Sequence, residues 1–365
     1  MMPGMSAPTA AMQDDISIDK DTGANDAAAP ARQPRLRAVL FDADHDDRAL
    51  DEHVLETSAV DCSALTDRQL LWIDVEDGSE HAADALVQRL VQQLGLGDGA
   101  IATLRELNGH PRLQNFGDWF LAQAIVVAHE GQLKFNGHGL AIVAGRNFVL
   151  SLHRGPLAFL ERLRSRERAD THLGVLSAES FTASLLDWQL ESYFDALTDF
   201  EAAVDRLEVA VLATTVHRDS LPQLAQLRRS ASRLRRMLAP HRSVFSALAR
   251  PDFRPDADGD ANAHFLALDE RFSRAMDAVE NARDLVVGSF ELFATRTAQR
   301  TNDTMRALTV FTVLLGTLAV LAGVLGMNFP AQFFQSGARG FWIAVGSMLA
   351  LAALALALAR WRRWL

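Results

Sequence analysis

Small and polar side chains form a stripe along a hydrophobic segment near the C-terminal end of the chain. Residues 307–325 include no charged side chain. Positions three and four residues apart lie on the same face of a helix. The members of the stripe are Asn302, Met305, Thr309, Thr312, Gly316, Ala319, Gly323 and Gly326. Such a face either packs closely against another helix or lines a path for ions, and the periodicity alone does not decide between them.

Two segments are long enough to cross a bilayer as helices. Residues 307–325 and 341–359 are each 19 residues long and free of charged side chains. A helix of this length spans about 28 Å, close to the roughly 30 Å thickness of the hydrocarbon core. Because arginine-rich flanks stay in the cytoplasm, both termini are predicted to lie there, and the connecting loop, with only Arg339, lies outside. The flanking arginines are Arg296, Arg300, Arg306, Arg360, Arg362 and Arg363.

A transport function would require more than one copy of the chain. Two helices cannot enclose a water-filled path, so several copies must surround an axis, which predicts a homo-oligomer.

Charge and cysteine content limit the partners and the compartment of the chain. The net charge of −10 argues against nucleic acid as the main partner. Cys62 is the single cysteine, so no disulfide forms within the chain, and the water-soluble part is expected to face a reducing cytosol.

The first half of the chain has the pattern of a cytoplasmic α/β domain, expected over residues 36–175. Its expected strands are rich in Val, Ile, Leu and Phe, and an amphipathic helix is expected at residues 80–94. The strands are expected at residues 36–41, 70–75, 119–129 and 148–153. Residues 1–35 carry five aspartates among Ala, Pro and Gly, without the apolar segment of a secretory signal, and are expected to form a disordered N-terminal tail.

Long helices are expected between this domain and the membrane, over residues 176–306. The chain is predicted to be helical from Ala178 to Arg250, and two prolines and a glycine between Pro251 and Gly259 end that helix. A second helix, from about residue 263 to residue 326, would be roughly 95 Å long and project from the membrane as a stalk. The acids on these helices either concentrate cations below a pore or form a solvated, ion-paired face, and the second interpretation is favoured.

Other groups of reactive side chains are better explained without catalysis. The aspartates after the first strand, from Asp42 to Asp47, have the Asp-x-Asp spacing of a phosphoryl-transfer nucleophile or, with His45, of a metal site. Catalysis would also need a lysine, and Lys134 is the only one beyond the tail, so a solvated acidic turn is favoured and no enzyme activity is expected. A cluster of arginines without interleaved aromatic residues is interpreted as an exposed helix face. It comprises Arg228, Arg229, Arg233, Arg235, Arg236 and Arg242.

The sequence Gly326-Met327-Asn328, directly after the first hydrophobic segment, resembles the signature of a known family. The chain is similar to the CorA-type magnesium and cobalt transporters, part of the two-span GxN superfamily that also includes ZntB-like zinc transporters. The resemblance covers roughly residues 36–365. Its further similar segments are residues 72–77, 145–153, 234–242, 301–309 and the basic ending at residues 360–365.

This resemblance implies a funnel-shaped homopentamer in the cell inner (plasma) membrane that moves Mg²⁺, with Co²⁺ or Ni²⁺ as further candidates. Each copy would combine the α/β domain, long stalk helices and a C-terminal two-helix transmembrane hairpin. The implied parts of the hairpin are a pore-lining helix at 307–326, an outer loop at 327–340, a second helix at 341–359 and a basic cytoplasmic tail at 360–365. Mg²⁺ sheds its waters reluctantly, and neutral amide oxygens accept hydrogen bonds from those waters without binding the ion too tightly.

The resemblance also assigns roles to residues. Gly326, Met327 and Asn328 would form the ion entrance. The inner constriction would be formed by Asn302, Met305 and Leu308, within a pore-lining set that continues through Thr309, Thr312, Gly316, Ala319 and Gly323. The position of a regulatory carboxylate corresponds to Ala267, so the nearby Asp269 and Glu270 are the candidates for metal sensing. Apart from the transported cation, no cofactor is expected.

Three departures from the family pattern keep alternatives open. Thr317 stands where a proline is common, and Gly316 and Ala319 stand where Met and Thr are usual. The outer loop from Met327 to Arg339 contains no Asp or Glu, whereas family loops often carry acids. The alternatives are a ZntB-type Zn²⁺ transporter, which can be proton-coupled, and a membrane-anchored scaffold or sensor that conducts no ions.

Overall fold

The computed structural model describes residues 34–45, 48–50, 65–77, 83–105, 107, 110–129, 131, 133–167, 177–213, 220–254, 259–327 and 337–362. The expected tail up to Gln33 therefore lies outside the described residues, as does Asn328. Contacts divide the chain into two compact units. The first consists of Met1–Ala203 with Ala225–Asp284, and the second of Val204–Leu224 with Leu285–Leu365.

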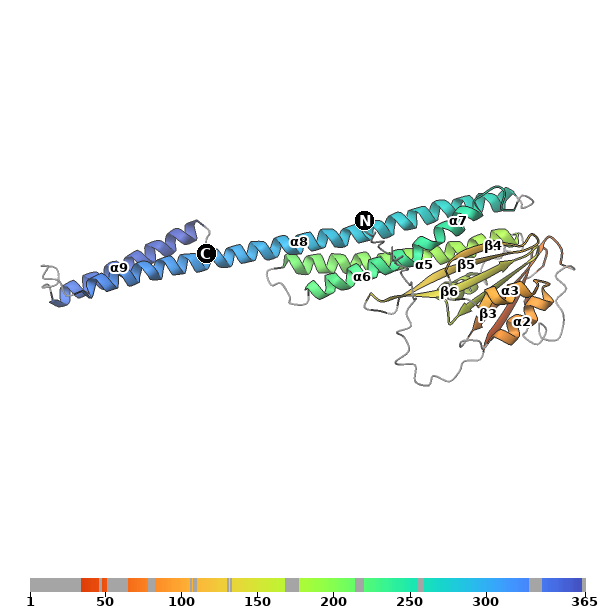
Figure 1. Cartoon of the computed structure of the whole chain (residues 1–365), viewed down its shortest axis with the longest axis horizontal. Helices are drawn as coiled ribbons and strands as arrows, with labels where there is room; N and C mark the ends of the chain where they lie inside the picture. Colours follow the sequence, from red (N-terminus) through yellow and green to blue (C-terminus); the bar gives the residue numbers. More distant parts are fainter. Residues whose placement is uncertain are drawn as a thin grey trace, which may run out of the picture. The chain divides into compact units, whose positions relative to one another are not determined.

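The described strands of the first unit form one mixed sheet with the order β2-β1-β3-β7-β6-β5-β4 (Figure 1). β3 and β7 pair in parallel, and the other neighbours pair antiparallel. The four predicted strands are confirmed as β1, β3, β5 and β7. The bounds are β1 Arg35–Asp42, β2 Arg48–Leu50, β3 Gln69–Asp77, β4 Arg112–Asn115, β5 Phe120–His129, β6 Phe135–Ala144 and β7 Phe148–Arg154.

Three strands were not predicted from the sequence. β2 and β4 have three and four residues, too few for a visible alternation of polar and apolar positions. β6 begins Phe-Asn-Gly-His-Gly, and Asn and Gly have low strand propensity. It forms because it pairs along its length with β5, from Phe120↔Ala144 to His129↔Phe135. Tertiary pairing therefore overrides local preference in this strand.

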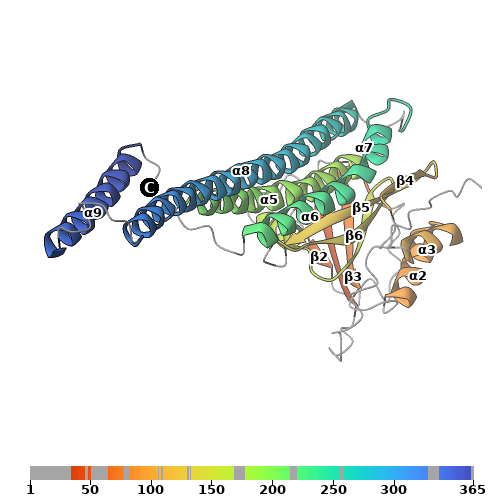
Figure 2. The ribbon, with the colours of Figure 1, turned by 60° about the vertical axis from the view of Figure 1, so that its left-hand side comes forward.

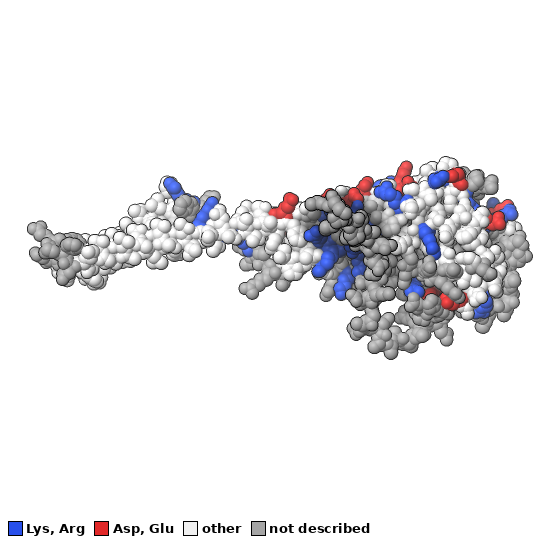
Figure 3. Space-filling view, viewed as in Figure 1, with Lys and Arg blue, Asp and Glu red and all other residues white. Residues whose placement is uncertain are grey.

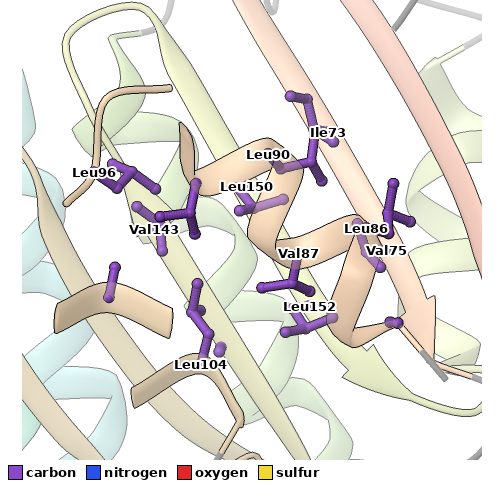
Figure 4. Packing of buried hydrophobic residues seen from close by; sticks show 14 of the residues in the cluster. Ile73, Val75, Leu86, Val87, Leu90, Leu96, Leu104, Val143, Leu150 and Leu152 are labelled. Carbon is purple, nitrogen blue, oxygen red and sulfur yellow. The ribbon is translucent and has the colours of Figure 1, made fainter. Parts of the chain in front are cut away.

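One face of the sheet is covered by α2 (Asp84–Gln93) and α3 (Asp98–Arg105). α2 lies within the helix predicted at residues 80–94. Alternate residues of a strand point to the same face, and apolar residues at these positions meet the leucines and valines of the two helices in a buried cluster (Figure 4). Each Leu or Ile buried in this way stabilises the fold by about 1.5–3 kcal/mol. Members include Ile73, Val75, Leu86, Val87, Leu90, Leu96, Leu104, Val143, Leu150 and Leu152.

The opposite face carries aromatic residues and packs against helices. Phe41 and Trp72 stack at 6.5 Å between ring centroids, and Phe181 of α5 (Ala178–Leu212) meets Trp72 edge-on at 5.4 Å. Figures 1 and 2 show α5, α6 (Ser220–Leu238) and α7 (Arg242–Leu248) running together along this side. The single helix expected from Ala178 to Arg250 is thus wrong, because α5 ends at Leu212 and α6 begins at Ser220. Pro222 lies in the first turn of α6. The backbone N–H groups of a first turn have no partner within the helix, so a proline, which lacks this N–H, is tolerated there.

Side chains from helices complete the free edge of β5. β4 pairs with β5 only between Phe120 and Gln123, so the outward N–H and C=O groups beyond that point need other partners. Gln189 and Tyr193 donate to the Ile125 carbonyl at 2.5 and 3.2 Å, and the Ile125 N–H donates to His241 Nε2 at 2.9 Å. His241 ends the short 3₁₀ helix η4 (Ala239–His241). These bonds fasten the helices to the sheet at defined positions.

The chain then forms the predicted long helix. α8 (Gly259–Leu325) is continuous over 67 residues, which corresponds to about 100 Å. α9 (Gly337–Trp361) includes the expected second span and starts one turn earlier, so residues 337–340 belong to a helix rather than to the outer loop. Both α8 and α9 contain a segment that is long and apolar enough to cross a membrane. A mixed α/β domain, a long helix and a C-terminal apolar helix confirm the predicted fold class.

Candidate functional site

The small and polar stripe lies on the membrane-spanning part of α8, within the second unit. All of its members are exposed in the single chain, and Leu308 is exposed with them. The partly covered positions of this part of α8 form a different face. They are Ala307, Val310, Leu314, Leu318 and Leu325. The contacts of one chain therefore leave the stripe open, together with large apolar positions such as Phe311, Val313 and Leu315, and the partly covered face consists mainly of leucine and valine.

The covered face of α9 is built from small residues. Its least exposed positions recur every three or four residues and are mostly alanine, which allows close approach of another segment. They are Gly340, Ala344, Met348, Ala352, Ala355 and Ala359, with Val345 beside Ala344. The sequence carries this signal in the spacing of its alanines, although the alternation with leucine hides it. Small residues on α9 thus serve packing within the chain, unlike those of the α8 stripe.

Threonine hydroxyls on the stripe are oriented by the helix backbone. The hydroxyl of Thr309 donates to the Met305 carbonyl at 2.8 Å, and that of Thr312 donates to the Leu308 carbonyl at 2.8 Å. A hydroxyl that donates to its own helix keeps its oxygen lone pairs as acceptors. Thr317 makes the same bond to Val313 at 2.8 Å but is not part of the stripe. The stripe therefore presents fixed oxygen acceptors that suit the waters of a hydrated cation.

The outer end of α8 closes with ordinary helix-end bonds. Gly326 N–H donates to the Ala322 carbonyl at 3.0 Å, and Met327 N–H donates to the Val324 carbonyl at 3.2 Å. A Cβ on Gly326 would meet the nearest atom, the Ala322 carbonyl oxygen, at 3.4 Å. Because that contact is tolerable, the fold of one chain does not require glycine here. The role of Asn328 at an entrance stays a prediction.

The inner end of the stripe continues into a groove of the second unit. Asn302 and Met305 line this groove, and Met305 is 59% exposed. The rest of its lining is mainly apolar and comes from α8 and the first turn of α6. These residues are Leu221, Phe290, Phe293, Ala294, Thr297, Ala298 and Thr301. The predicted inner constriction thus lies where the stripe changes from small residues to larger apolar ones.

Asp269 and Glu270, the candidates for metal sensing, lie near the start of α8. Asp269 is half-buried and Glu270 is exposed. Among the described residues, no three or more His, Cys, Asp or Glu side chains lie close enough together to hold a metal ion. The role of these two carboxylates in metal sensing stays a prediction.

The acidic turn after β1 has the hydrogen bonds expected of a structural feature. Gln69 donates to Asp42 Oδ2 at 2.8 Å, and the Asp44 N–H donates to Asp42 Oδ1 at 3.0 Å. The Gln69 bond and then the Asp44 backbone bond lower the pKa of Asp42 to about 2. Arg68 pairs with Asp44 at 3.0 Å. These contacts agree with the solvated turn rather than with a nucleophile.

A buried Ser-His-Asp cluster was missed at the sequence level. Ser151 donates to Asp74 at 2.5 Å and accepts from Trp72 Nε1 at 3.0 Å, while His153 Nε2 lies 3.4 Å from Asp74. Ser151, His153 and Asp74 are 0%, 2% and 3% exposed. A substrate cannot reach side chains buried to this extent. Their alternation along β3 and β7 places them on one face of the sheet, where the bonds satisfy polar groups inside the core.

Comparison with known proteins decides the family. The family model described as "CorA-like Mg2+ transporter protein" matches residues 67–360, which is most of the chain. The chain belongs to this family. The resemblance inferred from Gly326-Met327-Asn328 is thereby confirmed, and so is the class of divalent cation transporters that reside in membranes. The CorA family model does not determine which cation is carried.

Individual relatives are distant but cover most of the chain. The cobalt/magnesium transport protein CorA of Thermotoga maritima is 23% identical over 298 residues, covering 80% of this chain and 83% of the relative. The divalent cation transporter CmaX of Pseudomonas aeruginosa is 26% identical over 287 residues, covering 77% and 83%. Identity is therefore too low to transfer a specific substrate from either CorA or CmaX.

Solved structures share the fold. The CorA magnesium transporter of Methanocaldococcus jannaschii superposes with a TM-score of 0.68 at 20% identity, covering 90% of this chain and 98% of that one. Full-length CmaX gives 0.64 at 23% identity, with 92% and 100% covered. The cytoplasmic domain of ZntB from Vibrio parahaemolyticus gives 0.56 at 10% identity, with 72% and 99% covered. The soluble domain and the membrane helices therefore follow one shared CorA architecture.

Proposed function

We propose that five copies of this CorA-family chain form a Mg²⁺-conducting pore in the cell inner membrane, with α8 of each copy lining the path. The exposed stripe on α8 carries this proposal. It combines small residues, oriented threonine oxygens and one amide along a segment long enough to span the bilayer. A face of this kind suits a water-filled path, and the alternative use of its small residues is close packing against another helix.

In this proposal the ion keeps most of its water. Mg²⁺ dehydrates reluctantly, so the groups along the path accept hydrogen bonds from coordinated waters instead of replacing them. The asparagine amide of Asn328 would select hydrated dications at the outer mouth, and Thr312 and Thr309 would solvate them further in. With an inside-negative potential, a dication gains about 5 kcal/mol per 100 mV on entry. The proposed direction is therefore uptake with both termini in the cytoplasm.

Met305 and Leu308 would close the inner end of the pore. Both side chains are more than half exposed in the single chain, and rings of such apolar groups exclude water when they approach one another. Glu291 is exposed and lies two heptads before Met305, so it lies broadly on the same side of the helix. A ring of Glu291 would attract cations below the constriction, and Asp269 with Glu270 would extend the negative potential along the stalk.

Zn²⁺ is the second candidate cargo. Two observations favour it: the outer loop from Met327 to Arg339 has no Asp or Glu, and the cytoplasmic fold is also like that of ZntB. A loop without carboxylates does not raise the local dication concentration at the outer entrance, and this departure keeps the proton-coupled ZntB-type alternative open. A non-conducting scaffold is the third candidate, in which the stripe would serve only helix packing.

Flux into liposomes tests the proposal with a matched pair of variants. Thr312 and Thr317 make the same backbone hydrogen bond, but only Thr312 belongs to the stripe. We expect Thr312→Val and Asn328→Ala to reduce Mg²⁺ uptake several-fold, and Thr317→Val to leave it unchanged. Equal losses in both threonine variants would contradict the assignment of the pore face. Zn²⁺ uptake that needs a proton gradient, without Mg²⁺ uptake, would favour the second candidate, and no flux of either ion the third.

A further inference from the structure

Exposed arginines on the solvent-facing side of α6 and at the start of α7 form a basic surface, which we call the arginine ribbon. It consists of Arg228, Arg229, Arg235 and Arg236 of α6 with Arg242 of α7. All five side chains are exposed. The four arginines of α6 lie on two adjacent columns with a period of seven residues, so they share one side of that helix, and Arg242 follows directly after η4. Figure 3 shows basic side chains gathered where Figure 1 places α6. α6 itself contains no Asp or Glu.

The ribbon is largely without partners in the described part of the chain. Arg235 approaches Glu280 at 3.7 Å, and the Arg242 guanidinium lies 5.7 Å from the ring centre of Phe272. Arg228, Arg229 and Arg236 form no ion pair or hydrogen bond with any described residue. A row of like charges on one helix is destabilising without compensating negative charge. The ribbon is therefore suited to an acidic partner.

The chain itself contains a segment of matching charge. Residues 14–26 carry five aspartates against the single basic residue Lys20 and lie outside the described residues. The aspartates are Asp14, Asp15, Asp19, Asp21 and Asp26. We propose that this acidic N-terminal segment docks on the arginine ribbon through charge pairing. This inference does not depend on the identity of the transported ion.

Strand register shows that the segment can reach the ribbon. Arg35, Glu76, His153 and Leu140 lie in one row across β1, β3, β7 and β6, so Arg35 is about 14 Å from Leu140 across three strand spacings. Asn136 lies four residues further along β6, about 13 Å away, which puts it about 20 Å from Arg35. Arg233 of α6 donates to Asn136 at 3.0 Å. The row therefore connects the start of β1 to the middle of α6.

The length of the N-terminal segment is sufficient for this separation. The nine residues from Asp26 to Pro34 are separated by eight steps along the chain, which span at most about 28 Å when extended. Asp26 can thus reach the neighbourhood of Arg233, and the other four aspartates reach the whole ribbon with slack. Because the segment is attached to the same unit, its effective concentration at the ribbon is high, so several weak surface pairs act together.

Other occupants fit the ribbon less well. α6 contains no Phe, Tyr or Trp, which nucleic-acid surfaces use for stacking. Between Arg228 and Arg242, no large apolar side chain is exposed, although a helix that lies on a membrane inserts such residues. An acidic peptide without bulky apolar groups matches the surface as it stands.

Spin labelling of the full-length protein tests the docking. A nitroxide is attached at Ser17→Cys in a Cys62→Ser background, and its mobility is measured in neutral detergent. Raising the salt from 0.1 to 1 M shortens the screening length from about 10 to 3 Å. We expect a slow-motion component at low salt that falls at least threefold at high salt. At low salt, the triple variant Arg228→Gln, Arg229→Gln, Arg236→Gln should show a slow-motion component that is reduced to the same extent.

Matched controls separate docking from other causes. Arg274→Gln with Arg283→Gln removes two exposed arginines of α8 that lie outside the ribbon, and we expect the slow component to persist. If the ribbon variant does not fold, replacing Asp14, Asp15 and Asp19 by Asn removes the same pairs from the other side. A slow component that is absent in the wild type, or that survives either charge-removing variant, would overturn the proposal. Loss of the component in nanodiscs of anionic lipid alone would assign the ribbon to lipid headgroups and also overturn it.

Discussion

His241 links the stability of the first unit to pH. Its ring is fully buried and Nε2 accepts the Ile125 N–H at 2.9 Å, so Nδ1 carries the proton that is donated to the Leu238 carbonyl at 3.1 Å. Gln189 Nε2 lies 3.4 Å from the same acceptor nitrogen. Protonation would place two donors against each other inside the core. Burial, as the largest cause, therefore lowers the pKa of His241 from 6.5 to about 4.

The sign and size of the effect follow from linkage. Between pH 6.5 and 4 the unfolded chain binds a proton at His241 that the folded protein does not, so stability is present at neutral pH and is lost as pH falls. Each pKa unit corresponds to about 1.4 kcal/mol. The loss should thus reach about 2 kcal/mol at pH 5 and about 3 kcal/mol at pH 4. For a unit of this size, each kcal/mol shifts the melting temperature by about 2–4 °C.

A non-titrating variant isolates this contribution. In His241→Gln, the amide oxygen can still accept the Ile125 N–H, whereas no proton is taken up. Tryptophan fluorescence of the full-length protein in detergent gives melting temperatures from pH 7.5 to 4.5 for both proteins. All other ionisable groups are common to both proteins, so their contributions cancel in the difference. We expect the wild type to lose about 4–8 °C more than the variant by pH 5. Parallel curves, or a wild type that gains stability in acid, would refute the reasoning.

Three further outcomes follow from the packing and the proposed pore. Gly145→Ala should lower the melting temperature, with a destabilisation of about 1–3 kcal/mol, because the added Cβ would overlap the Phe148 ring. The control Gly99→Ala should leave the melting temperature unchanged, because its Cβ would meet no atom within 4 Å. Ser151→Ala should lower the free energy of unfolding by about 1–3 kcal/mol, since Trp72 Nε1 loses the Ser151 acceptor in the core. An unchanged free energy of unfolding, measured by chemical denaturation, would show that the Ser-His-Asp cluster does not stabilise the fold. Met305→Asn should increase Mg²⁺ leak into liposomes at zero potential, because a polar ring holds water where an apolar one excludes it; unchanged leak would place the constriction elsewhere.

Local patterns predicted the membrane hairpin, the long helix and four strands. The charge-free stretches, the flanking arginines and the absence of helix breakers between residues 263 and 325 are local signals that can be seen in short stretches of sequence. The same reasoning failed at β6, whose glycines and polar residues form a strand only because β5 lies beside it. It also failed between α5 and α6, where the continuous helical pattern did not reveal the interruption after Leu212.

The sequence by itself thus determined which segments are apolar enough for a bilayer, and Gly326-Met327-Asn328 identified the family. Only the tertiary structure decided the strand order, the parallel pairing of β3 with β7, and the partners of buried polar groups. His241 was one of several scattered histidines in the sequence, and in the structure its ring accepts a hydrogen bond from the Ile125 N–H at the free edge of β5. The α8 stripe was ambiguous by periodicity, and the structure showed that one chain leaves it exposed. Periodicity defines which residues share a face, but whether that face is covered depends on residues far away in the chain.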